Sequence, residues 1–224
     1  SNDGGGIYNT AGGSVNVTTS ALSANSAVDE GGAIYNTGVG SLFGLVNSTI
    51  SGNSAVRGAG IRNIGGPVTV TNGTITANAA SVEGGGIYST SGSVNAKNTI
   101  VAGNSATTRH PDVSGTLTSQ GHNVIGDPTG SDAFADGTNG DRVGTVETPL
   151  SPRLSPLQDN GGPTLTHLPQ ADSPVIDAGT NEGVASTDQR GALRIVDNDE
   201  DRENFVTRMG SIALETGTSI YACA

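Results

Sequence analysis

GGGIYN, at residues 4–9, returns three times along the chain in slightly altered form. It reads GGAIYN at residues 31–36, GAGIRN at 58–63 and GGGIYS at 84–89. The isoleucines of the four copies are 27, 27 and 26 residues apart, at Ile7, Ile34, Ile61 and Ile87. A fixed period of this length indicates a repeat architecture in which each unit stacks on the next.

A second motif keeps the same rhythm. It reads SALSANSA, STISGNSA, GTITANAA and NTIVAGNSA, and its asparagines are Asn25, Asn53, Asn78 and Asn104. Between the two motifs each repeat holds short runs of β-type residues broken by Gly, Asn and Ser, without the three- and four-residue apolar spacing of a helix. Three short strands in about 26–27 residues are the size of one coil of a parallel β-helix, in which equivalent residues stack about 4.8 Å apart.

This reading predicts an all-β fold, a right-handed parallel β-helix (β-solenoid) with an irregular Pro/Gly-rich C-terminal region. Three internal apolar columns are expected. They are Ile7, Ile34, Ile61 and Ile87; Leu22, Ile50, Ile75 and Val101; and Val17, Val46, Val70 and Ala96.

Composition agrees with a narrow solenoid core. Glycine makes up 35 of the 224 residues, and aromatic residues only 3%. Glycine and asparagine tolerate the positive φ angles of tight corners. The asparagine columns are therefore expected to be turn formers that hydrogen-bond from coil to coil, with a ligand-binding row as the alternative. These columns are Asn9, Asn36 and Asn63, and Asn25, Asn53, Asn78 and Asn104.

The net charge of −11 is unevenly spread. Residues 1–106 hold four acids and three bases, giving −1, and the remaining 118 residues hold 17 acids and 7 bases, giving −10. Such a surface repels nucleic acid and anionic lipid, so neither is an expected partner. No run of 18 apolar residues exists, so no membrane span is expected. The single cysteine, Cys223, excludes an intramolecular disulfide.

Three regions are expected. Residues 1–127 carry the β-helix repeats, 128–149 form a Gly/Asp/Thr-rich loop, and 150–224 continue or cap the solenoid. Six of the nine prolines fall between Pro149 and Pro174, which favours extended chain there. The opening SNDGGG resembles the middle of a repeat, so the chain is expected to be a processed or truncated product of a longer precursor.

The order of motifs after the repeats resembles a known family. PDVSG, SQGHNVIGD, LSPLQDNGGPTLTH, SPVIDAG and TDQRG follow the repeats in this order. The chain is similar over residues 4–194 to bacterial surface proteins with right-handed β-helix repeats and a choice-of-anchor Q domain, and loosely to polymorphic outer-membrane proteins. The resemblance implies secretion and a cell-surface location, and brings no catalytic residues. The ending departs from the family pattern, with GSIALE at residues 210–215 where relatives have a segment like DIGAFE.

Catalysis is not expected, because acid–base groups are few in the repeats. A glycan hydrolase needs two or three carboxylates on one face. The regular coils hold four acids, of which Asp29, Glu30 and Glu83 occupy equivalent corners and could form a weak acidic stripe. A polysaccharide-cleaving enzyme therefore remains an alternative.

Two kinds of candidate site follow from local motifs. Asp197, Asp199, Asp201 and Glu203 alternate in VDNDEDRE and are a candidate Ca²⁺ site, with a solvated acidic turn as the alternative. No other cofactor is expected, and the three histidines, at 110, 122 and 167, lack partners at ligand spacing. Asn16, Asn47 and Asn72 begin N-x-Ser/Thr sequons and are candidate glycosylation sites.

A column of large side chains lies beside the isoleucines and is expected to point outward. Its members are Tyr8, Tyr35, Arg62 and Tyr88. A stacked tyrosine row can bind sugar rings or a partner surface, but a packing row is the favoured interpretation.

Taken together, the sequence predicts a non-catalytic, extracellular, structural or adhesive surface protein. Self-assembly into a filament is expected through a C-terminal interface formed by Ile212, Leu214, Ile220 and Tyr221. Such a contact joins two different surfaces and propagates unless it closes a ring. The expected partners are further copies of the chain and surface glycans, and a polysaccharide-binding or polysaccharide-cleaving β-helix protein is the alternative.

Overall fold

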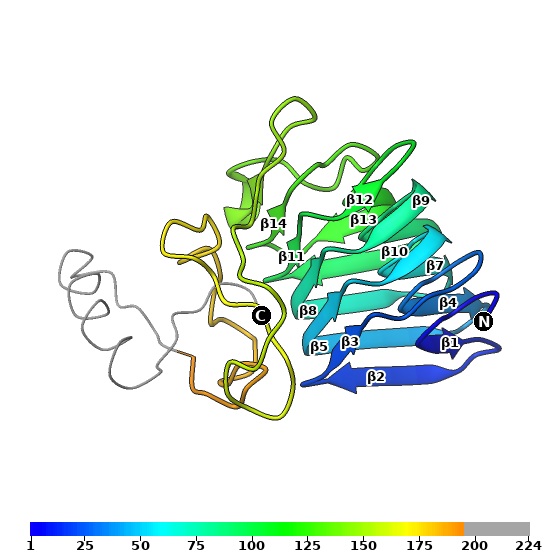
Figure 1. Ribbon diagram of the computed structural model, residues 1–224, viewed down its shortest axis with the longest axis horizontal. Helices are drawn as coiled ribbons and strands as arrows, with labels where there is room; N and C mark the ends of the chain where they lie inside the picture. Colours follow the sequence, from blue (N-terminus) through cyan, green and yellow to red (C-terminus); the bar gives the residue numbers. More distant parts are fainter. Residues whose placement is uncertain (195–224) are drawn as a thin grey trace.

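The isoleucine of each GGxIYN motif pairs with the isoleucine one coil along. The structure is a computed structural model that describes residues 1–194. The first row of parallel strands comprises β1 (Ile7–Asn9), β4 (Ile34–Gly38), β7 (Ile61–Gly65), β10 (Ile87–Lys97) and β13 (Val113–Ser119). Ile34, Ile61 and Ile87 are completely buried in it. The predicted parallel β-helix is confirmed, with five coils along this column (Figure 1).

A second row of strands forms the broad face of each coil. It comprises β2 (Ser14–Thr18), β5 (Leu42–Ser51), β8 (Val68–Thr76) and the later part of β10. One expected column is wrong by a residue here, because Val17 pairs with Leu45 and not with Val46. Leu45 is fully buried, whereas Val46 pairs with Thr18 and Thr71 on the outward side. Side chains alternate along a strand, so a shift of one residue exchanges core for surface.

The expected column of Leu22, Ile50, Ile75 and Val101 is confirmed and extends further than expected. Leu22 in β3 (Ala21–Ser23) pairs with Ile50, and Ile50 with Ile75. Val101 in β11 (Ile100–Val101) continues the column, followed by β14 (Val124–Ile125) and β15 (Arg142–Val143). A small sheet of β6 (Ser54–Arg57), β9 (Ala79–Glu83) and β12 (Ser105–Ala106) closes each coil. Its inner side is lined by alanines at 27, 55, 59, 80 and 106.

The glycine corner allows neighbouring coils to approach closely. Gly31 has a φ of +69°, which side chains rarely adopt, and a Cβ atom there would lie 2.6 Å from the carbonyl oxygen of Ile34. Gly32 is equally confined, because its Cβ would lie 2.5 Å from the carbonyl oxygen of Ala59 on the next coil. The repeated glycines therefore serve chain geometry.

Asparagine ladders run along the corners, as expected. Asn9 donates from Nδ2 to Asn36 Oδ1 over 2.7 Å, and Asn36 donates to Asn63 over 2.9 Å. A further ladder of Asn47, Asn72 and Asn98 occupies left-handed corners, with φ between 46° and 53°. Buried polar side chains in these ladders satisfy one another, which is why they can lie inside the stack.

The expected loop at residues 128–149 is mostly loop, and it joins the solenoid through β15, which pairs with β14. It holds β15, a short 3₁₀ helix (Thr138–Gly140) and the buried side chain of Phe134, which packs into the main core together with Val143. The segment therefore covers the last coil with its own side chains. At the opposite end the core residues Ile7, Val15, Val17 and Leu22 are only partly buried.

Residues 150–194, here called the strap, lie along one side of the strand stack, where Figure 1 shows them in yellow to orange. Val175 and Ala178 of the strap are buried against Ile100 and Val124. Further along, Thr180 bonds to Asn98 in both directions, over 2.6 and 3.0 Å. The strap therefore neither continues the coils nor covers an end, but clamps their flank. Among residues 1–194, no helix is long and apolar enough to cross a membrane.

Candidate functional site

The richest grouping of charged and aromatic side chains is a ridge along one corner of the coils. We use this name for two adjacent columns. The inner column, directly after the buried isoleucines, is Tyr8, Tyr35, Arg62, Tyr88 and Ser114. The outer column is Asp3, Glu30, Arg57, Glu83 and Arg109.

The aromatic members of the ridge pack on their neighbours. The rings of Tyr8 and Tyr35 lie 5.2 Å apart at 50°, and the Arg62 guanidinium lies 4.2 Å from the centre of the Tyr88 ring. Tyr8 is 52% exposed, whereas Tyr35 and Arg62 are buried at 7% and 6%. Burial, followed by the charge of Glu30, raises the pKa of Tyr35. The row leaves the core as expected, but its middle is packed, and Tyr8 offers the most open ring.

The outer column begins with two acids, Asp3 and Glu30, and alternates in sign from Glu30 onward, so it is not an acidic stripe. Arg57 stands between Glu30 and Glu83, and contacts Glu30 at 3.9 Å and Asp29 at 3.8 Å. Arg62 Nε lies 3.1 Å from Glu30 Oε2, although this N–H makes no aligned hydrogen bond. The expected acidic stripe is therefore wrong, because Arg57 pairs with Glu30 and Arg109 pairs with Glu83.

Glu83 is the centre of the most elaborate cluster on the ridge. Its Oε1 lies 2.9 Å from Ser114 Oγ and 2.9 Å from His110 Nδ1, and its Oε2 accepts from Arg109 over 3.0 Å. Burial by itself would raise the pKa of Glu83, but the hydrogen bonds from His110, Arg109 and Ser114 outweigh it and lower the pKa to about 2. The carboxylate stays ionised at neutral pH and is poorly suited to general acid catalysis.

The same cluster differs from a serine–histidine–acid relay. In a relay the imidazole lies between the hydroxyl and the carboxylate, one ring nitrogen on each. Here Ser114 Oγ and His110 Nδ1 converge on one carboxylate oxygen, and they lie 3.2 Å from each other. Ser114 is also buried, at 4% exposure. The arrangement is that of an ion pair reinforced by hydrogen bonds.

The three sequons differ sharply in accessibility. Asn16 is exposed on the broad face, over Gly44 of the next coil. Asn47 and Asn72 are buried. Asn47 Nδ2 donates to Thr187 O over 2.9 Å, and Asn72 Nδ2 donates to Asn47 Oδ1 over 2.8 Å. A glycan on either Nδ2 would break the ladder and collide with the strap. In the folded chain only Asn16 remains a candidate acceptor.

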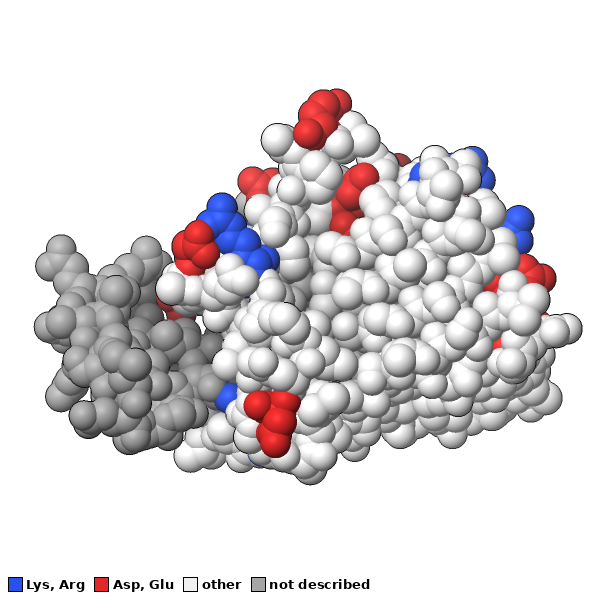
Figure 2. All heavy atoms as spheres, viewed as in Figure 1, with Lys and Arg blue, Asp and Glu red and all other residues white. Residues whose placement is uncertain are grey.

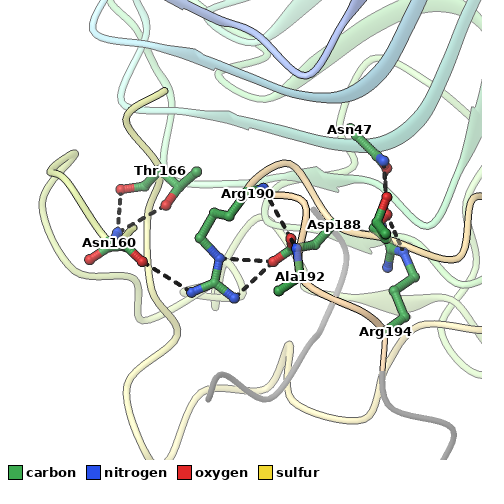
Figure 3. Close-up of polar contacts among 8 residues, drawn as sticks. Asn47, Asn160, Thr166, Asp188, Arg190, Ala192 and Arg194 are labelled. Atoms are coloured by element: carbon green, nitrogen blue, oxygen red, sulfur yellow. Dashed lines mark hydrogen bonds and ion pairs between the residues drawn. The ribbon is translucent and has the colours of Figure 1, made fainter. Parts of the chain in front are cut away.

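The TDQRG segment of the strap makes the most specific contact with the coils. Asp188 accepts from the backbone N–H groups of Arg190 and Ala192, and the Arg190 side chain bridges Asp188 and the carbonyl of Asn160 (Figure 3). This turn places Gln189, which is 1% exposed, against the second coil. Gln189 Oε1 accepts from Thr49 over 2.7 Å, and Nε2 donates to Ser20 O over 3.1 Å. Sequence reasoning did not foresee this contact, because Gln189 belongs to no repeat.

A groove of about 490 Å³ lies between the strap and the third coil. Thr76 and Ala77 form one wall, and Arg153, His167 and residues 151–156 line the other side. Both ring nitrogens of His167 are engaged, with Ser155 O at 2.6 Å and Ser51 Oγ at 2.9 Å. Burial lowers the pKa of His167, so its ring is neutral at pH 7 and serves as a bridge between strap and coil.

Charged side chains gather at the margins of the face shown in Figure 2, and a broad area over the stacked strands shows neither acids nor bases. No group of three or more potential metal ligands occurs within residues 1–194. The candidate Ca²⁺ ligands Asp197, Asp199, Asp201 and Glu203 lie outside the described residues. So does the expected assembly interface, Ile212, Leu214, Ile220 and Tyr221.

Comparison with known proteins adds no relative: no family model matches the chain, and neither a curated protein nor a solved structure matches it.

Proposed function

We propose that the chain is a non-catalytic, extracellular scaffold, a rigid β-solenoid that presents a polar surface for adhesion. One observation carries the proposal. The charged groups of the ridge pair with each other from coil to coil, so that Glu30 contacts two arginines and Glu83 contacts Arg109, His110 and Ser114. Groups used in this way stabilise the stack and are poorly placed to exchange protons with a substrate.

The rest of the surface suits an adhesive role. The outward positions of the broad face carry small polar side chains such as Asn16, Thr18, Thr69 and Thr118, all exposed. Such a face is rigid, because the strands beneath it are paired on both sides over most of the stack. A secreted, surface-attached location accords with the family resemblance of the motifs and is part of the proposal.

Polysaccharide binding is the second candidate function, favoured by Tyr8. Its ring is 52% exposed and is held by Tyr35 at 5.2 Å, so little conformational freedom would be lost when a sugar ring stacks on it. Tyr88, over Arg62, lies three coils further along the same ridge. Equivalent positions recur about 4.8 Å apart, so the two rings span about 14 Å, the length of a short oligosaccharide.

One experiment addresses both candidates. The purified chain is incubated with a panel of soluble and insoluble neutral and acidic polysaccharides, and both new chain ends and retained protein are measured. The scaffold proposal expects no cleavage of any glycan. Turnover that disappears in Glu83→Gln while the circular dichroism spectrum persists would overturn it. Retention that Tyr8→Ala abolishes and Leu42→Ala leaves intact would identify the ridge as the glycan-binding surface.

A further inference from the structure

The two ends of the solenoid differ in their side chains. At the end formed by the last coil, Phe134 packs into the core and is only 6% exposed. At the end formed by the first coil, Ile7, Val15, Val17 and Leu22 are only partly buried. The residues that pair with them on the second coil, Ile34, Phe43, Leu45 and Ile50, are at most 2% exposed. One more coil would bury the first set as the second coil is buried now.

The asparagine ladders have a direction, and it is the same in two of them. Asn25 donates to Asn53 Oδ1 from its backbone N–H and from Nδ2, each over 2.9 Å. Asn53 donates to Asn78 in the same way, and Asn78 to Asn104. Every Oδ1 after the first therefore accepts two hydrogen bonds from the coil before it. The ladder that starts at Asn9 also donates towards the later coils.

The first residue of each of these two ladders has an unused acceptor oxygen, whereas the ladder of Asn47, Asn72 and Asn98 donates in the opposite direction. Within residues 1–194, neither Asn9 Oδ1 nor Asn25 Oδ1 accepts a hydrogen bond, although Asn9 is only 4% exposed. The other end of the Asn25 ladder is closed by a group that needs no onward partner. Asp112 Oδ1 accepts both bonds from Asn104, and Asp112 Oδ2 accepts from the backbone N–H of Asp127. A carboxylate has no proton to donate, so it ends the ladder.

We propose that the outer face of the first coil is a docking surface for one further coil of the same repeat type, carried by a different solenoid segment. The occupant presents an N–H donor above Asn9 Oδ1 and two above Asn25 Oδ1, and buries Ile7, Val15, Val17 and Leu22. The direction of the ladders that begin at Asn9 and Asn25 disfavours a second copy of residues 1–194. Its last coil is covered by Phe134 and ends in Asp112, and a head-to-head pair would set acceptor oxygens against acceptor oxygens. This inference is independent of the proposed adhesive role.

The test adds one coil to the full chain. A copy of residues 1–27 is placed directly before Ser1, which keeps the 27-residue register of Asp3 with Glu30 and Ile7 with Ile34. The matched control carries Asn9→Asp and Asn25→Asp in the added copy alone, which preserves shape but removes both side-chain donors. Amide hydrogen exchange and the melting temperature are measured for the natural chain and both fusions.

The expected result is that the Asn-bearing copy slows exchange in β1, β2 and β3 about tenfold or more and raises the melting temperature by about 2–4 °C. The Asp-bearing copy is expected to lose most of both effects. Exchange in β8 and β10 should stay unchanged in all three proteins, which checks that the remaining coils are folded.

Three outcomes would overturn the inference. An added coil whose amides exchange like a free peptide would show that the face does not accept a coil. Equal protection by both fusions would show that the amide donors are irrelevant. A natural chain that sediments as a dimer, with its first-coil amides already protected, would show that a second copy occupies the face.

Discussion

Asn53 donates two hydrogen bonds to Asn78 one coil along, from its backbone N–H over 3.0 Å and from Nδ2 over 2.8 Å. Both residues are buried, at 1% and 0% exposure. In this ladder, Asn53 and Asn78 each donate to the side-chain oxygen of the next asparagine and accept from the one before. A ladder of this kind makes the stability of each coil depend on its neighbours.

Asn78→Asp is expected to lower the free energy of unfolding by about 3–5 kcal/mol. Asn78 Nδ2 donates to the Ile50 carbonyl and to Asn104 Oδ1. A carboxylate would point an unpaired negative charge at both oxygens. Urea unfolding followed by circular dichroism measures the change. Asn16→Asp, on an exposed asparagine, is the control and should cost under about 0.5 kcal/mol. Equal losses in the two variants would contradict the importance of the ladder.

Ile61→Ala is expected to cost about 2–5 kcal/mol, because Ile61 is fully buried between Ile34 and Ile87 and leaves a cavity. Val39→Ala is the matched control. Val39 is 98% exposed, so its truncation should change the unfolding midpoint by less than the error of the measurement. A tolerant Ile61 would remove the assignment of this column to the core.

The Glu83 cluster predicts a loss of stability in acid. The pKa of Glu83 is about 2 in the folded chain and near 4.5 when unfolded, so its contribution is present above about pH 4.5 and is lost as the pH falls through about 2. The shift corresponds to about 2–3 kcal/mol. From pH 6 to pH 3 the urea midpoint should therefore fall less in Glu83→Gln than in the natural chain. Parallel pH profiles would contradict the ion-pair role.

The buried carboxyl group of Asp112 predicts a pH dependence of stability with the opposite sign. Burial raises the pKa of Asp112 to about 6. The hydrogen bonds from Asn104 and Asp127 lower the pKa, but burial outweighs them. The contribution of Asp112 is therefore fully present below about pH 3.8 and is lost as the pH rises through about 6. Between pH 7 and pH 5 the natural chain should gain about 1–2 kcal/mol relative to Asp112→Asn. A variant with the same pH profile as the natural chain would show that Asp112 stays ionised throughout.

Gln189→Ala is expected to cost about 1–3 kcal/mol and to loosen the strap. It removes the acceptor of the buried Thr49 hydroxyl and one of the two donors to the Ser20 carbonyl, which keeps the Thr49 backbone N–H. Hydrogen exchange should become faster at residues 187–192 while β7 and β8 keep their protection. Gln120→Ala, on an exposed glutamine of the coils, is the matched control. Unchanged exchange in the strap would indicate that the apolar contacts of Val175 and Ala178 hold it alone.

The repeat columns could be predicted because they depend on local periodicity. Ile34 above Ile61, and Ile50 above Ile75, follow from the spacing of two motifs. Val46 was misplaced because β5 carries Leu45 and Val46 side by side, and the period does not tell which of two adjacent apolar residues faces inward. Pairing with Val70 decided in favour of Leu45.

The ridge was foreseen in part. Its inner column is the position directly after each repeated isoleucine, so the period predicts that Tyr8, Tyr35, Arg62 and Tyr88 are stacked. Its chemistry was not foreseen, because the contacts of Glu83 with His110 and Ser114 join residues 27 and 31 positions apart, beyond the regular repeats. Whether a charged side chain is neutralised depends on the residues of the neighbouring coil, and a single motif does not contain that information.

By itself, the sequence determined the coil, its length and the identity of most inward residues, because a fixed period imposes one environment on each column. Only the tertiary structure decided what becomes of the non-repeating part. It places Phe134 over the last coil and lays the strap along the flank, where Gln189 reaches Thr49 across 140 residues. The physical reason is that these segments have no period of their own. Their positions follow from which buried polar groups and apolar edges the finished stack leaves to be covered, and those exist only once the coils have formed.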